Sequence, residues 1–136
     1  MKRFEIMQFL SKKLKEILPE NGYQTDTGRF VFVAKATPPD PDRCEVLIYD
    51  LGQENEYRNG IRQSSLSVEV FVVSSEPYQE LIKRVYDIYS AIEKDPFLFG
   101  SSSLTKVESD EFLLAQEDKR YLGCSIKLSI VYLEEA

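Results

Sequence analysis

Two groups of carboxylates are the residues in this sequence whose type and spacing best suit chemistry. They are Asp40, Asp42 and Glu45, and then Glu108, Asp110 and Glu111. Mg²⁺ and Ca²⁺ prefer carboxylate oxygens as ligands, so the first group could serve a metal-assisted enzyme. Its spacing matches no EF-hand loop, however, and acids among prolines are ordinary in a surface loop. We expect neither group to be a metal site.

Other catalytic equipment is missing from the sequence. The chain has no histidine, so it cannot build by itself a Ser-His or Cys-His nucleophile, an imidazole base or a His-ligated zinc site. Its six glycines form neither a GxGxxG nor a GKS/T phosphate-binding pattern. Cys44 and Cys124 predict two reduced thiols that act as small hydrophobic residues, and a bridge between them would require neighbouring strands. We therefore expect no enzyme activity, no catalytic residues and no cofactor.

The composition is typical of a single globular domain spanning residues 1–136. Hydrophobic residues make up 43% of the chain and charged residues 29%. The net charge of −6 argues against general nucleic-acid binding, because Lys and Arg supply the affinity for phosphate. No stretch approaches the ~20 apolar residues of a membrane span, and the first residues form no signal peptide. These features predict a cytoplasmic protein without a membrane partner.

The charge is unevenly distributed along the chain. In the first 18 residues, five basic side chains against two acidic ones give a net charge of +3, so the remaining residues carry −9. A basic helix could meet an acidic patch on another copy of the protein, or it could simply be solvated. Three tyrosines, Tyr78, Tyr86 and Tyr89, recur at helical spacing. Such tyrosines more often belong to a core or to the edge of an interface than to a ligand site.

Two helices are predicted from hydrophobic periodicity. Lys2 to Leu18 places apolar residues three and four positions apart, and Pro19 ends this helix. A second helix begins near Ser75, which can cap it, and Pro77, which suits a first turn; it ends at Asp95-Pro96. A hydrophobic flap, residues 97–100, follows it.

Strands are predicted where apolar residues alternate or run continuously. The expected strands cover residues 29–35, 44–50, 65–72, 104–109 and 122–132. Loops are expected at 36–43, which contains three prolines, at 52–60, which is polar, and at 115–120, which is charged. The predicted fold class is therefore α+β, in the order α-β-β-β-α-β-β. It is a mostly antiparallel or mixed sheet of about five strands with two helices packed on it.

The run from Pro41 to Tyr132 resembles the bacteriophage tail terminator family, typified by the minor tail protein U of lambda-like phages. The matching features are an apolar strand after a proline-rich loop, a polar Gly/Glu/Tyr loop, a strand reading Leu-Ser-Val-Glu-Val-Phe-Val, a helix and a last strand. In this chain they occupy Cys44 to Leu51, Gly52 to Gly60, Leu66 to Val72, the helix containing Ile88 to Ile92 with Asp95 to Leu98 after it, and the strand ending at Tyr132. The first helix matches only as a helix.

The resemblance implies a structural virion protein without catalytic residues. Members of the family form a hexameric ring at the head-proximal end of the tail, cap the tail tube, stop its growth and offer a surface to the head-completion protein. DNA passes only through the lumen of such a ring. The expected location is the host cytoplasm during assembly and then the virion tail, in a phage or a prophage. The alternatives are another phage neck or tail-completion adaptor, or a small interaction module without catalysis.

Two sets of interface residues are predicted. The first lies in the polar loop, Gln53 to Asn59, because interfaces are enriched in Tyr and Arg. Its members are Glu56, Tyr57, Arg58 and Asn59. The second is Lys12, Lys13 and Lys15, facing either a neighbour's acidic surface or the lumen that DNA traverses. A metal-assisted enzyme using Asp40, Asp42 and Glu45 is the third and least favoured hypothesis.

Overall fold

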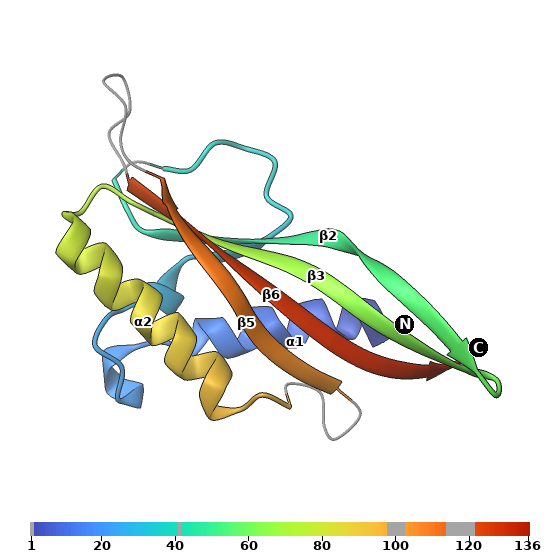
Figure 1. Ribbon diagram of the computed structural model, residues 1–136. Helices are drawn as coiled ribbons and strands as arrows, with labels where there is room; N and C mark the ends of the chain where they lie inside the picture. Colours follow the sequence, from blue (N-terminus) through green and yellow to red (C-terminus); the bar gives the residue numbers. More distant parts are fainter. Residues whose placement is uncertain (1, 41, 98–102, 114–121) are drawn as a thin grey trace.

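The computed structural model describes residues 2–40, 42–97, 103–113 and 122–136. It confirms the α+β fold and the predicted order of helices and strands (Figure 1). The elements are α1 (Lys2–Lys15), β1 (Val31–Val33), β2 (Glu45–Arg58), β3 (Ile61–Ser74), α2 (Tyr78–Lys94), β5 (Ser103–Leu113) and β6 (Leu122–Glu135), with short 3-10 helices η1 (Pro19–Asn21) and η2 (Thr27–Arg29). The predicted loop at 115–120 and residues 98–100 of the predicted flap lie outside the described residues.

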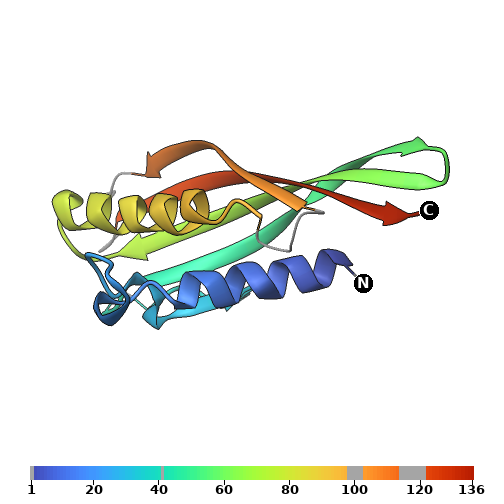
Figure 2. The same ribbon diagram turned by 90° about the horizontal axis from the view of Figure 1, so that it is seen from below.

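One five-stranded sheet forms the body of the protein, in the order β1-β2-β3-β6-β5. β1 runs parallel to β2, and the other neighbours are antiparallel. Both helices lie side by side on one face of this sheet (Figure 2). The core between sheet and helices contains the alternating residues of the strands, such as Val70, Ile126 and Leu128, because successive side chains of a strand point to opposite faces.

The helix boundaries differ slightly from the prediction. α1 ends at Lys15, before the expected Leu18, because Leu18 precedes Pro19 and takes an extended conformation (φ −138°, ψ 149°). The expected capping of α2 by Ser75 is wrong: Pro77 is the N-cap residue, and no side chain caps the helix. The predicted end of α2 is confirmed, with Asp95 as its C-cap residue.

The predicted polar loop at 52–60 is also wrong. β2 continues through it to Arg58, and Tyr57 and Arg58 pair in register with Arg62 and Ile61 of β3. The chain reverses at Asn59-Gly60, whose φ values of 51° and 77° are both positive, as a tight hairpin turn requires. Both faces of this part of the strand are exposed, so its residues carry no alternation of apolar and polar types. The Asn-Gly pair was the signal that could have revealed the hairpin.

The end of this hairpin projects past the helices, and we call it the arm: Gln53–Arg58 of β2, Ile61–Ser65 of β3 and Val131–Glu135 of β6. Figures 1 and 2 show it extending from the body of the sheet. Polar contacts bind its three strands together. The Tyr132 hydroxyl donates to Gln53 Oε1 at 2.7 Å, and the amide of Ala136 donates to the carbonyl of Gly60 at 2.8 Å. The arm is therefore a paired, ordered extension of the sheet.

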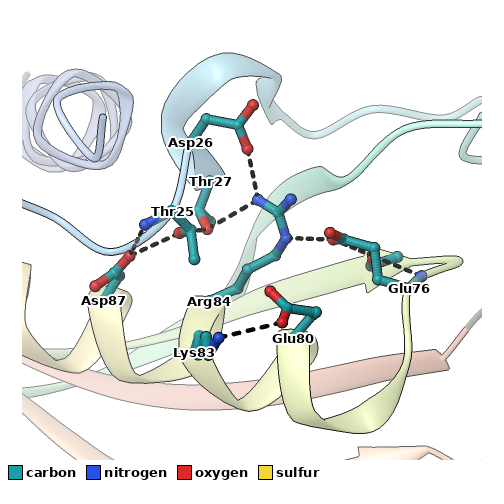
Figure 3. A network of polar contacts seen from close by, with 9 residues as sticks. Thr25, Asp26, Thr27, Glu76, Glu80, Lys83, Arg84 and Asp87 are labelled. Atoms are coloured by element: carbon teal, nitrogen blue, oxygen red, sulfur yellow. Dashed lines mark hydrogen bonds and ion pairs between the residues drawn. The ribbon is translucent and has the colours of Figure 1, made fainter. Parts of the chain in front are cut away.

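A buried polar network fastens the segment before β1 to α2 (Figure 3). Arg84 is only 8% exposed; its Nε donates to Glu76 at 2.6 Å and its Nη1 to Asp26 at 2.9 Å. Asp87 accepts hydrogen bonds from the amide and the hydroxyl of Thr25, at 2.8 and 2.6 Å. Arg84 is paired with two carboxylates, and Asp87 is held by hydrogen bonds from Thr25, so the network positions the segment before β1 against α2.

Candidate interaction surfaces

One member of the first predicted carboxylate group, Glu45, is neutralised within the chain. Glu45 is fully buried, and its carboxylate accepts hydrogen bonds from Lys35, from Arg43 at 2.8 Å and from the amide of Asp40 at 3.2 Å. Burial alone would raise the pKa of Glu45, but these hydrogen bonds outweigh it and lower the pKa. Lys35 and Arg43 already balance the negative charge of Glu45, which a metal ion would otherwise use. Within the described residues, no cluster of Cys, Asp or Glu has an arrangement suited to a metal ion.

The second carboxylate group belongs to an edge of the sheet. Asp110 accepts a hydrogen bond from the hydroxyl of Tyr89 at 2.6 Å. Glu108 lies at a β-bulge between Val107 and Ser109, and Glu111 is exposed on the same strand. The group therefore gives the outer strand β5 an acidic border.

The two cysteines are free thiols, and β3 separates the strands that carry or adjoin them. Cys124 is buried and Cys44 is partly buried. Burial raises the pKa of Cys44 to about 11 and that of Cys124 to about 12. Thiols with such pKa values carry little thiolate near neutral pH, so neither is an activated nucleophile.

The four interface residues predicted in the polar loop lie together at the hairpin tip, at the end of a paired strand and in its tight turn. Tyr57 is 65% exposed and points to the side of the sheet that the helices occupy. Glu56 and Arg58 point to the opposite side, because adjacent residues of a strand alternate in direction. Asn59 forms the turn. Tyr57 and Arg58 therefore cannot anchor the same patch of a partner.

Sequence reasoning missed two apolar residues of the arm. Ile61 and Leu133 are 44% and 43% exposed, and they line a shallow hollow with Arg58 on the face away from the helices. Alternation along β3 and β6 could have placed them on that face. Their exposure depends on how far the arm extends beyond the rest of the sheet.

The structure separates the three predicted lysines of α1. Lys13 forms an ion pair with Asp95, with 3.1 Å between Nζ and Oδ2, so it binds within the chain. Lys12 and Lys15 are exposed and have no ion-pair partner in the part of the chain that the structure describes. They lie toward the end of α1 away from the hairpin tip, so the two predicted sets of interface residues are not brought together (Figure 2).

Lys12 and Lys15 border a groove between α1 and β1, which we call the α1–β1 groove. It encloses about 1030 Å³. Its lining is mostly apolar and includes Phe4, Met7, Val31, Phe32 and Val33. Phe4, which the helical pattern places on the apolar stripe, is 57% exposed here, and Val33 is 42% exposed. The groove is thus an uncovered apolar surface with a basic border.

A second apolar hollow lies at the opposite edge of the sheet, between α2 and β5; we call it the α2–β5 hollow. It encloses about 390 Å³ and is lined by Ile82, Val85, Tyr86, Tyr89, Ser90, Glu93, Asp110 and Phe112. Tyr86 is 67% exposed, and the ring of Tyr78 packs edge-on against Phe112 at 5.4 Å. Tyr89 packs against the core; burial, and then its hydrogen bond to Asp110, raises its pKa. The tyrosines therefore divide between core and exposed edge.

The sequence was compared with protein-family models and with curated proteins: no family model matches the chain, and no curated protein is significantly similar to it. Neither described helix has the length and apolar character that crossing a lipid bilayer demands.

Proposed function

We propose that this protein is a bacteriophage tail terminator, a structural protein that assembles with copies of itself into a hexameric ring. The ring caps the tail tube, ends its polymerisation and offers its other surface to the head-completion protein. It is made in the host cytoplasm and becomes part of the virion tail, and DNA passes through its lumen. The resemblance of Pro41 to Tyr132 to the terminator family supports this proposal.

The observation that carries the proposal is the difference between the two edges of the sheet. A cyclic ring needs two unlike, complementary patches on every subunit. One edge offers the α1–β1 groove with Lys12 and Lys15, and the other offers the α2–β5 hollow beside the acidic strand β5. Both patches combine exposed apolar side chains with charge, which is the composition of an interface core and its rim.

The arm has a separate role in this proposal. It projects from the body of the subunit and exposes Tyr57, Ile61 and Leu133. An extension of this kind reaches a surface that the compact part of the subunit does not, such as the end of the tail tube.

Electron microscopy of the purified protein, alone and mixed with tail tubes, tests the proposal. We expect six-fold rings, and a single ring at one end of each tube whose length then stays constant. A protein that remains monomeric at high concentration and also leaves tube ends bare would contradict the proposal. Several copies distributed along a tail, or binding only at a portal, would instead favour another neck or completion adaptor.

A further inference from the structure

We infer that the acidic edge of one copy, β5 with the α2–β5 hollow, docks into the basic α1–β1 groove of the next copy. This inference rests on the proposed self-assembly and names the two surfaces that carry it. Its occupant is a second copy of the same chain.

The α1–β1 groove contains basic side chains that form no ion pair within the described residues. Arg3 at its border is engaged by Asp50, with both bonds at 2.7 Å, and Lys35 is engaged by the buried Glu45. Lys12 and Lys15 stay unpaired within the described part of the chain. The two free cations therefore flank an apolar groove that nothing in the described chain covers.

The β5 edge has the complementary excess of acid. Its strand, Ser103–Leu113, contains Glu108, Asp110 and Glu111 against one base, Lys106. Glu93, which lines the hollow, and the exposed Glu108 have no ion-pair partner among residues 2–40, 42–97, 103–113 and 122–136. These acids match the unpaired lysines of the groove in sign and in availability.

Apolar surface accompanies the charge on both sides. Phe4 and Val33 are exposed in the groove, while Tyr86 is exposed in the α2–β5 hollow. Burying these side chains against one another removes apolar area from water, which supplies the main driving force of association. The charged residues around them then set partner choice and register.

The positions of the two surfaces suit a ring. They occupy opposite edges of one sheet, because β1 and β5 are the first and last strands in the order β1-β2-β3-β6-β5. β5 pairs only with β6 among the described strands, and β1 only with β2, so each has an outer edge open to a neighbour. A contact between unlike edges repeats from copy to copy and closes when the rotation permits.

Charge reversal tests the pairing. Lys12→Glu with Lys15→Glu makes both edges of a subunit acidic, and Glu93→Lys with Glu108→Lys makes both edges basic. Each variant alone should associate at least about a hundredfold more weakly than the wild type in sedimentation equilibrium, because like charges then face each other. An equimolar mixture should recover wild-type association, since every interface in an alternating ring again joins opposite charges.

Lys83→Glu with Lys94→Glu is the matched control, because it changes the charge of an exposed part of α2 by the same amount. It should associate as the wild type does. If the wild type associates and the reversed variants do so equally well, or fail to recover on mixing, the inferred interface is wrong and the ring proposal stands. If the wild type itself stays monomeric up to millimolar concentration, both are overturned.

Discussion

The two halves of β2 differ in burial although they form one continuous strand. Glu45 to Ile48 is buried between neighbours on both sides, whereas Gln53 to Arg58 is exposed apart from its polar contacts within the arm. Gly52, with a φ of 116°, marks the irregularity between them. The buried half contributes to the core, and the exposed half forms part of the arm. Substitutions in the two halves should therefore separate stability from assembly.

The largest effect is expected from Ile48→Ala in the buried half. Ile48 has no exposed surface, and truncating it leaves a cavity in the core. We expect a loss of about 3 kcal/mol in the free energy of unfolding, measured by urea denaturation. Leu51→Ala is the control in the same strand, since Leu51 is 52% exposed and should change stability by less than about 0.5 kcal/mol. If both variants lose the same free energy of unfolding, the proposed difference between the two halves is wrong.

The second effect concerns the buried carboxylate of Glu45. Glu45→Gln should cost about 2 kcal/mol at neutral pH, because it removes the negative charge that Lys35 and Arg43 share. The folded protein lowers the pKa of Glu45, so its contribution is complete above the unfolded value near 4.5 and is lost as the pH falls through the lower folded value. The difference in stability between wild type and variant should shrink accordingly below pH 4.5.

Glu54→Gln is the control for that prediction. Glu54 lies in the exposed half of the same strand and forms no ion pair with any described residue. Unfolding curves of this variant should follow those of the wild type at each pH. A wild-type advantage over Glu45→Gln that persists unchanged down to pH 2 would show that charge is not what Glu45 contributes.

The same contrast explains what could be read from the sequence. The buried strands were predictable because alternation along Leu66 to Val72 and Cys124 to Tyr132 records which side chains face the core. The arm was not predicted because neither of its faces is buried, so its strands show no alternation of apolar and polar residues. The α1–β1 groove could not be predicted for another reason: it forms only when α1 packs beside the three-residue strand β1, which follows the two 3-10 helices. Likewise, only packing distinguishes Lys13, which meets Asp95, from Lys12 and Lys15.

A smaller effect is expected at the tip of the arm. Gly60 has a φ of 77°, which residues with a Cβ atom adopt only with strain, so Gly60→Ala should lower stability by about 1 kcal/mol. Asn59→Gly is the control, because Asn59 also has a positive φ, of 51°, and glycine relieves it. Thermal unfolding should show a lower midpoint for the first variant only. A midpoint unchanged by Gly60→Ala would mean that the turn does not constrain the arm.

The smallest effect on stability is expected from Tyr57→Ala with Arg58→Ala. For this variant we expect the largest difference between the effect on stability and the effect on assembly. Both side chains are exposed at the tip, so the free energy of unfolding should change by less than about 0.5 kcal/mol. Tube capping or ring formation, followed by electron microscopy, should nevertheless be impaired, because exposed Tyr and Arg are the residue types that most often anchor interfaces. Glu20→Ala with Gln24→Ala, exposed residues near η1, is the control and should assemble normally.

The two single variants sharpen this test, because Tyr57 and Arg58 point to opposite faces of the arm. A partner that lies against one face should be affected by one substitution and not by the other. Loss of assembly with Tyr57→Ala alone would place the partner on the side of the sheet that carries the helices. Loss with Arg58→Ala alone would place it beside Ile61 and Leu133. Normal assembly of the double variant would remove Tyr57 and Arg58 from the interface.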